Sequence, residues 1–280
     1  MGPIFPKELL LKKTRKMDLS KIDAAKTPFC QDKEQAQVLL EKYKKRIYEL
    51  FYLMFAENQR SVLIILQGID TSGKDGVVRF LFDAANPQGL KMFSFKKPSD
   101  EDLKHDFLWR CHKVTPASGE TVIFNRSYYE DVIATFVHPE FLLDRHLPDK
   151  IKASKDLFKM RYNQINDFER MLKQNGTSVL KFLLHITKAE QKERLKARVA
   201  DPTKNWKFSV NDLKERKLWS KNMKAFEAMV DHTSTKDAPW VIVPANKKWY
   251  RDLIICKTIV EHLESLKMKY PKLESKPKIS

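Results

Sequence analysis

The sequence has few cysteines, and none lies in a metal-binding arrangement. Its 280 residues contain only three cysteines, Cys30, Cys111 and Cys256. They form no CxxC pair, and no cluster of histidines and cysteines has the spacing of metal ligands. We therefore expect free thiols and a reducing compartment.

Long hydrophobic runs and a secretion signal are also absent. A transmembrane helix needs about 20 apolar residues, whereas apolar runs such as Val62–Leu66 are far shorter. The N-terminal stretch MGPIFPKELLLKKTRKMD has neither the apolar core nor the small-residue cleavage site of a signal peptide. Pro6 stands where a myristoylation motif needs Ser or Thr. We expect a soluble, cytoplasmic protein with no membrane partner.

Acidic residues are outnumbered by basic ones. The chain carries 53 Lys and Arg against 36 Asp and Glu, a formal net charge of +17. Such an excess indicates a polyanionic partner, which could be nucleic acid, an anionic membrane or a polyphosphate-like substrate. The alternative is that scattered lysines merely confer solubility.

Short apolar runs alternate with helical patterns along most of the chain, and no internal repeat is present. Residues 1–35 and the tail 271–280 are expected to be loose, which leaves residues 36–270 as one folded domain. Continuous apolar strands separated by helices are typical of a parallel sheet covered on both faces, so we predict an α/β fold. The five strand candidates are Val62–Leu66, Met92–Phe95, Thr121–Asn125, Val179–His185 and Trp240–Val243.

The stretch GIDTSGKDG, residues 68–76, follows the first predicted strand and opens a helix at Lys74. A glycine, four residues and then Gly-Lys in that position predict a phosphate-binding loop. Gly73 and Gly76 let backbone N–H groups approach phosphate oxygens, and the helix N-terminus adds positive charge. Lys74 would supply a cation to a transferring phosphoryl group.

Two acids make this loop unusual. Asp75 stands where such a loop normally has Ser or Thr, and Asp70 lies within the loop itself. A carboxylate beside phosphates is repelled unless a cation lies between them, so Asp70 is a candidate Mg²⁺ ligand or a base. The alternative for Asp70 is a turn-forming residue. Asp75 either faces the phosphates or is a first-turn acid favoured by the helix dipole.

A second polar cluster, FNRSYYED, follows the third predicted strand. Ligands of open α/β sheets bind beyond the carboxyl ends of strands, where a guanidinium such as that of Arg126 can fork onto phosphate. Asp131 is a second candidate Mg²⁺ ligand, and Glu130 either orients a nucleotide or caps a helix. Tyr128 and Tyr129 are expected in the wall or the core.

Residues 194–221 are rich in Lys and Arg, and Pro202 with the Lys204-Asn205 turn divides them into two helices. A basic helical hairpin beside a phosphate-binding loop predicts a lid that excludes water and brings arginines to the transferring phosphate. A solvated charged face is the alternative. Trp206, Phe208 and Trp219 argue against full solvation.

Taken together and in order, these motifs resemble the polyphosphate kinase 2 family. They are GIDTSGKDG, NPQG, FKKPSDEDLKHDFLWR, FNRSYYEDV, RYNQINDFERML, DPTKNWKFSVNDLKER and PWVIVPANKKWYR. The resemblance implies a three-layer P-loop kinase fold with a five-stranded parallel sheet and a helical lid. It also implies Mg²⁺-dependent, reversible phosphoryl transfer between inorganic polyphosphate and nucleotides.

The resemblance also suggests roles for individual residues. Asp70 and Asp131 match the family's metal-binding acids, and Lys74 and Arg126 match its phosphate-binding cations. The Asn125-Arg126-Ser127 variant, with Glu130 following, resembles the nucleotide-binding motif of the single-domain class that accepts both AMP and ADP. Other members carry Asp at position 125. Candidates for a polyphosphate groove, beside Gly73, Asp75 and Gly76, are Lys96, Lys97, Arg110, Arg198, Lys204, Lys207 and Arg216.

The expected partners are polyphosphate, AMP, ADP and ATP, with guanine nucleotides as further candidates, and the family often forms dimers or tetramers. The rival function is an ATP-dependent, thymidylate-kinase-like nucleoside-monophosphate kinase. That rival predicts Ser or Thr at position 75 and no large positive charge. A nucleic-acid-binding protein is the other rival, although no signature of a nucleic-acid-binding module is present.

Overall fold

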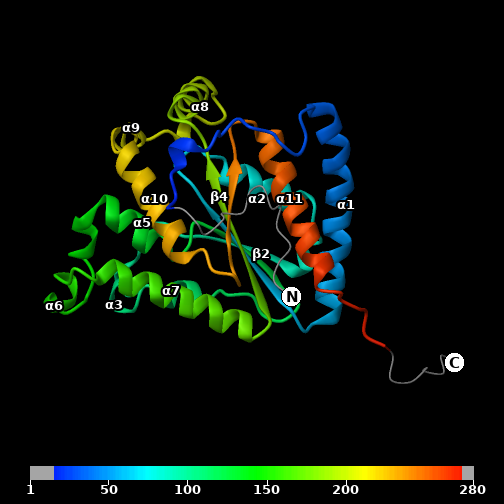
Figure 1. The fold of residues 1–280 in the computed structure, drawn as a ribbon, viewed down its shortest axis with the longest axis horizontal. Helices are drawn as coiled ribbons and strands as arrows, with labels where there is room; N and C mark the ends of the chain where they lie inside the picture. The colour runs from blue at the N-terminus through cyan, green and yellow to red at the C-terminus, as the bar shows by residue number, and fades with distance from the viewer. Residues whose placement is uncertain (1–15, 273–280) are drawn as a thin grey trace.

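The computed structural model describes residues 16–272, at whose centre lies a five-stranded parallel sheet (Figure 1). Its strands follow the spatial order β2-β3-β1-β4-β5, and each neighbouring pair is parallel. All five predicted strands are confirmed, with slightly different ends. They are β1 (Ser61–Gln67), β2 (Leu90–Ser94), β3 (Thr121–Asn125), β4 (Thr177–His185) and β5 (Trp240–Pro244).

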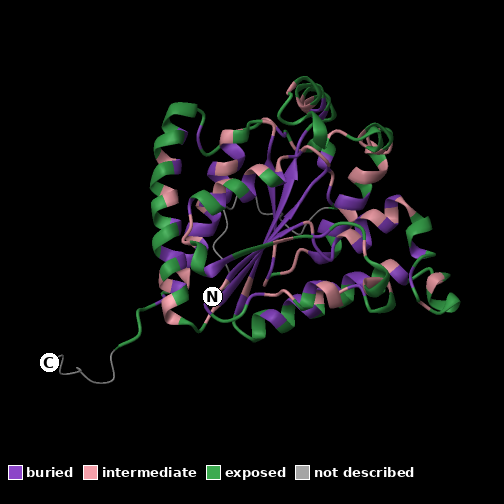
Figure 2. Ribbon diagram, turned by 180° about the vertical axis from the view of Figure 1, so that it is seen from behind, coloured by how far each residue is buried: buried purple, intermediate pink, exposed green. Residues whose placement is uncertain are grey.

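Helices cover both faces of the sheet, as predicted for a three-layer α/β fold. Helices α1 (Lys33–Glu57), α2 (Lys74–Asp83) and α11 (Lys248–Ser265) lie on one side, and α5 (Glu130–Val137), α7 (Leu157–Gln174) and α10 (Trp219–Thr233) on the other (Figures 1 and 2). Short helices complete the described chain: α3 (Asp100–Lys104), α4 (Trp109–His112), α6 (Asp149–Lys152), α8 (Lys188–Ala200), α9 (Val210–Lys217) and the 3-10 turns η1 (Leu19–Lys21), η2 (Pro87–Gly89), η3 (Pro139–Leu142) and η4 (Asn205–Lys207).

Burial explains why the strands read as continuous apolar runs. Every residue of β1, β3 and β5 is buried, because helices shield both faces of the sheet along these strands (Figure 2). β2, at one edge of the sheet, is much more open, since only Leu90 of its residues is buried. The carboxyl ends of β1 and β3 are neighbours in the sheet, and this places the segments that follow them side by side.

Two of the short helices begin at capping boxes. Ser99 and Asp102 form a reciprocal capping box at α3, and Ser209 and Asp212 form another at α9. The long helix α7 begins at Leu157 and ends at Gln174. The basic segment forms two short helices, α8 and α9, with η4 between them, as predicted.

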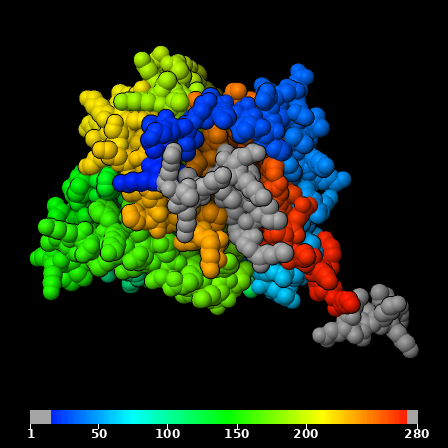
Figure 3. Space-filling model, in the orientation of Figure 1, coloured from blue at the N-terminus to red at the C-terminus, as the bar shows by residue number. Residues whose placement is uncertain are grey.

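The expectation that residues 1–35 are loose is wrong for residues 16–32. This segment crosses the surface from α10 to α1 (Figure 3). The backbone N–H groups of Met17 and Leu19 donate to Asp231 and Glu227 of α10, both at 2.8 Å. The side chains of Met17 and Leu19 are buried. Residues 1–15 and most of the predicted loose tail, residues 273–280, lie outside the described residues.

Cys30, Cys111 and Cys256 are free thiols and all three are buried, which confirms the predicted thiol state. Among residues 16–272, no helix combines the length and the apolar character needed to cross a membrane.

Candidate functional site

The phosphate-binding loop lies between β1 and α2, where the sequence predicts it. Gly73 has a φ of 106°, and a Cβ at this position would lie 2.0 Å from Nη1 of Arg251. A Cβ at Gly76 would lie 3.1 Å from the same guanidinium. Both glycines therefore make room for Arg251, which is buried beside the loop on α11.

A second arginine fixes the loop from the lid side. Arg194 of α8 donates from Nη1 to the carbonyls of Thr71 and Ser72, both at 2.9 Å. Its Nη2 donates to the carbonyls of Ala245 and Asn246 at 2.6 and 3.0 Å. Nothing in the sequence separates Arg194 and Arg251 from the many other basic residues, so their contacts with the loop could not be predicted.

Lys74 is buried at the start of α2. Its Nζ donates to the carbonyl oxygens of Gly68 at 2.6 Å and Ile69 at 3.3 Å. Burial, reinforced by the nearby charge of Arg126, lowers the pKa of Lys74 to about 8. The ammonium group of Lys74 is thus held inside the loop, close to the charges of Arg126 and Asp70.

Asp70 and Arg126 form an ion pair just beyond the ends of the neighbouring strands β1 and β3. Nη2 of Arg126 donates to Oδ1 of Asp70 at 2.7 Å, and Nη1 lies 3.9 Å from Oε2 of Glu130. The charge of Glu130, chiefly, raises the pKa of Arg126. The backbone of Arg126 has a φ of 64°, a conformation that a non-glycine residue adopts at an energetic cost. The structure therefore brings these predicted site residues together.

Asp131, the second predicted Mg²⁺ ligand, is paired with arginine side chains. Its carboxylate is bonded to Arg145 and lies 4.0 Å from Nη1 of Arg161, and all three side chains are buried. Nη1 of Arg161 also donates to the backbone carbonyl of Asp131 at 2.5 Å. The sequence analysis did not identify either arginine. In the structure, Asp131 therefore serves as the counter-ion of two cations.

The predicted Mg²⁺ was tested against the carboxylates that are present. Within residues 16–272, no three Asp, Glu, His or Cys side chains form a cluster that could hold a metal ion. Mg²⁺ in kinases commonly uses one or two carboxylates, with waters and substrate phosphates as its other ligands. Asp70, which faces the cavity, fits that pattern, and Glu130 is the second carboxylate beside Arg126.

Asp75 does not follow the pattern of a phosphate-facing loop residue. Its Oδ1 accepts a hydrogen bond of 2.9 Å from Nδ2 of Asn125, the last residue of β3. Its Oδ2 lies 3.6 Å from Nζ of Lys207, in the turn η4 between the lid helices. Asp75 thus has partners on two other elements.

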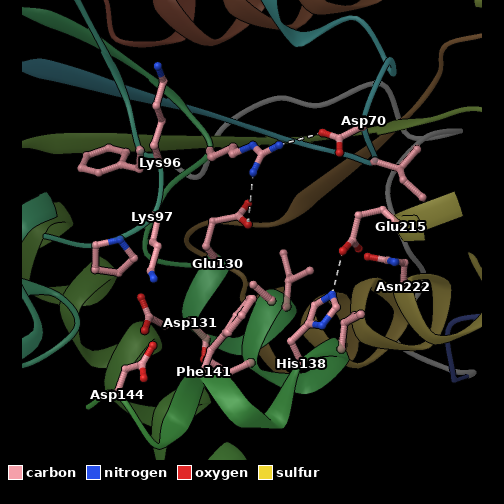
Figure 4. Close-up of a pocket in the computed structure, with 18 of the residues that line it drawn as sticks. Asp70, Lys96, Lys97, Glu130, Asp131, His138, Phe141, Asp144, Glu215 and Asn222 are labelled. Atoms are coloured by element: carbon pink, nitrogen blue, oxygen red, sulfur yellow. Dashed lines mark hydrogen bonds and ion pairs between the residues drawn. The ribbon is translucent and has the colours of Figure 1, made fainter. Parts of the chain in front are cut away.

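A cavity of about 430 Å³ opens beyond the ends of β1 and β3 (Figure 4). One part of its lining is charged, with Asp70, Lys96, Lys97, Arg110 and Arg126. Nη1 of Arg110 donates to the carbonyl of Lys96 at 2.9 Å. The other part of the lining is mixed, with Ile133, Val137, His138, Phe141, Asn211, Glu215, Asn222 and Phe226.

The lid contacts the body of the protein beside this cavity. Oε1 of Glu215 on α9 lies 2.8 Å from Nε2 of His138, at the end of α5 (Figure 4). Of the predicted lid cations, Lys207 reaches Asp75 of α2, whereas the others bond within the hairpin. Arg198 donates to Asp212 at 3.3 Å, Arg216 donates to the carbonyl of Lys188 at 2.6 Å, and Lys204 pairs with Asp201.

Tyr128 and Tyr129 belong to the core, as expected. Their hydroxyls donate to Oε1 of Glu169 at 2.8 and 2.7 Å. Nζ of Lys181 donates to the other oxygen of Glu169 at 2.7 Å, and all four side chains are buried. This network anchors the start of α5 behind Arg126.

Comparison with known proteins gives consistent results. The family described as Polyphosphate kinase 2 (PPK2) matches residues 30–271. An ADP-polyphosphate phosphotransferase of Rhodopseudomonas palustris is 42% identical over 268 residues, which cover 96% of this chain and 93% of that protein. An AMP/ADP-polyphosphate phosphotransferase of Meiothermus ruber is 43% identical over 243 residues, covering 87% and 86%. The crystal structure of polyphosphate kinase 2 from Arthrobacter aurescens, 38% identical, superimposes with a TM-score of 0.89 over 97% of this chain and 93% of that one.

Proposed function

The chain belongs to the polyphosphate kinase 2 family and is a polyphosphate:nucleotide phosphotransferase, and we propose that it phosphorylates both AMP and ADP in the cavity beside the lid. The observation that carries the proposal is the meeting of Asp70 and Arg126 at 2.7 Å, on the wall of that cavity and beside the buried Lys74. A carboxylate and two cations at one point provide the charges that phosphoryl transfer needs.

The acceptor nucleotide occupies the cavity. The apolar side chains of Ile133, Val137, Phe141 and Phe226 suit a nucleobase, and Asn222 and Glu215 offer polar groups to its edge. The phosphates of the nucleotide then point toward Arg126, whose guanidinium can bond two phosphate oxygens at once.

The donor polyphosphate approaches along the basic surface formed by the loop and the lid. Lys74 neutralises the phosphate that is transferred, and Lys207, Lys204 and Lys97 contact the following phosphates. The net charge of +17 supports binding of a long anion. Because such binding releases counter-ions, the affinity for polyphosphate should fall steeply as salt is added.

Asp70 is the residue that we assign to Mg²⁺, with Glu130 as its neighbour. When bound, the ion neutralises phosphate charge and helps to align donor and acceptor. Asp131 stays a prediction as a metal ligand, and its pairing with Arg145 favours a structural role.

The transfer is a direct in-line displacement. A terminal oxygen of the acceptor forms a bond to the terminal phosphorus of polyphosphate, and the bond from that phosphorus to the rest of the chain breaks. The shortened polyphosphate leaves with the electron pair of the broken bond, and no covalent enzyme intermediate forms. Arg126 and Lys74 stabilise the spreading negative charge, and the lid excludes water that would hydrolyse the donor.

ATP formation from purified protein, Mg²⁺ and long-chain polyphosphate tests the proposal. ADP is the acceptor in one series and AMP in the other, and no other phosphate donor is added. We expect ATP from both. ATP from ADP alone would contradict the dual-acceptor assignment. No transfer from polyphosphate, with phosphorylation of AMP once ATP is supplied, would instead indicate a nucleoside-monophosphate kinase.

A further inference from the structure

We propose that Asp75, the residue after the phosphate-binding lysine, is a positioning residue that joins the lid to the end of β3 and is matched to Asn125. The proposal rests on the proposed function, because it assigns a further residue to the same site. In a common phosphate-binding loop, this position holds Ser or Thr. Here each oxygen of one carboxylate has its own partner on another element.

The first partner lies at the end of β3. Asn125 is buried, with 8% of its surface exposed, and its Nδ2 donates to Oδ1 of Asp75 at 2.9 Å. The next residue is Arg126, which has its backbone in the left-handed region and bonds to Asp70. A bond that fixes Asn125 therefore fixes the point from which Arg126 reaches the cavity.

The second partner lies in the lid. Nζ of Lys207 is 3.6 Å from Oδ2 of Asp75, and the side chains of Lys207 and Asp75 are 38% and 64% exposed. Burial acts against ionisation of Asp75, but the bond from Asn125 and the charge of Lys207 outweigh it and lower the pKa of Asp75. Asp75 is therefore charged when the lid turn lies against α2.

The two links differ in strength. The bond to Asn125 involves a buried amide, which would lose its partner if Asp75 lost its acceptor oxygen. The ion pair with Lys207 is exposed, and such pairs contribute little. We therefore expect the β3 link to matter more for turnover and the lid link to matter more for the mobility of the lid.

The match between positions 75 and 125 can be reversed. Asn125→Asp alone places two carboxylates against each other, which repels them. Asp75→Asn alone keeps an oxygen that can accept from Nδ2 of Asn125, but it removes the negative charge, so the hydrogen bond is weaker. The double variant Asp75→Asn/Asn125→Asp restores an amide and a carboxylate with the roles exchanged. Its ion pair with Lys207 stays lost.

Steady-state rates for AMP and ADP, with polyphosphate as donor, test the β3 link. We expect Asn125→Asp to lose about tenfold in kcat, Asp75→Asn to lose several-fold, and the double variant to return to within about threefold of the wild type. Asp83→Asn is the matched control, since Asp83 ends the same helix, is exposed and pairs with Lys44 at 3.3 Å. Losses that simply multiply in the double variant would overturn the match.

Hydrogen–deuterium exchange of residues 201–208 tests the lid link without substrate. Asp75→Asn, the double variant and Lys207→Ala should all exchange faster there than the wild type, by about two- to threefold. Lys196→Ala is the control, because Lys196 pairs with Glu193 within α8 at 3.1 Å. Unchanged exchange in Asp75→Asn and Lys207→Ala would overturn the lid link. If the wild type transferred nothing from polyphosphate, the proposed function would fail, but this comparison would still decide the coupling.

Discussion

Asp70 and Asp131 follow neighbouring strands at the same edge of the sheet and both line the cavity, yet they differ in burial and in charge pairing. The side chain of Asp70 is 34% exposed, faces the cavity and has a hydrogen bond to Arg126. The side chain of Asp131 is 3% exposed and lies between Arg145 and Arg161. The same residue type is therefore partly open to solvent and paired with one arginine in the first case, and buried between two arginines in the second.

The comparison predicts the largest effect on stability at Asp131. Asp131→Asn leaves two buried arginines without their counter-ion, and we expect the free energy of unfolding to fall by about 3–5 kcal/mol. Urea denaturation would measure it. The double variant Asp131→Asn/Arg145→Met should lose less, because it also removes one of the unpaired charges. Normal stability of Asp131→Asn combined with a large loss of turnover would instead support a role of Asp131 as a metal ligand.

Asp70→Asn should have the reverse profile. The amide keeps the shape of the side chain and can still accept from Arg126, but it lacks the charge that Mg²⁺ needs. We expect kcat to fall by about 100-fold or more, which is about 2.7 kcal/mol in the barrier, with the unfolding midpoint unchanged. Asp83→Asn on α2 provides the control. Near-normal turnover in Asp70→Asn would rule out its assigned role.

The phosphate-binding loop also contains a buried cation, Lys74. It differs from the buried Arg145 because a lysine can lose its proton in the accessible pH range. Its pKa is about 8 in the folded protein against 10.5 as the ordinary value. Below pH 8 both states are protonated, and the folded state carries a charge that burial disfavours. Between pH 8 and 10.5 the unfolded state keeps the proton that the folded state releases, so this contribution to stability rises with pH.

Unfolding of the wild type and Lys74→Met at pH 7, 8.5 and 10 would measure this contribution. We expect the stability of the wild type, relative to the variant, to improve with pH by on the order of 2 kcal/mol. A difference that stays constant over this range would show that Lys74 has an ordinary pKa. Arg145→Met should show no such trend, because arginine does not titrate in this range.

Local pattern was sufficient to predict most of the fold. The five strands are continuous apolar runs, and the capping boxes at Ser99 and Ser209 mark helix starts. Asp70, Lys74 and Arg126 could be placed together because parallel strands end at one edge of the sheet. Those predictions needed only the identity of each residue and its position relative to a strand.

Contacts between side chains that lie far apart in the sequence could not be predicted. The pairing of Asp131 with Arg145 and Arg161 could not be predicted, because no local signal marks either arginine as its neighbour. Arg194 and Arg251 likewise could not be told apart from surface cations. Residues 16–32 looked loose because the carboxylates that hold Met17 and Leu19 lie more than 200 residues away in α10.

The smallest expected effect on turnover lies in the lid. Glu215, like Asp70, lines the cavity and contacts a basic side chain. His138 lies between Glu215 at 2.8 Å and Glu140 at 2.9 Å, and it stacks on Phe141. Glu215→Gln keeps a hydrogen-bonding group but removes charge from the contact between α9 and α5. Since Glu140 remains beside His138, we expect KM for the nucleotide to rise only about two- to threefold, with kcat nearly unchanged. Glu193→Gln on α8 is the control. A tenfold fall in kcat would instead place the lid carboxylate among the groups that act on the transferring phosphate, and the contrast between substrate-serving and structural acids would then extend to the lid.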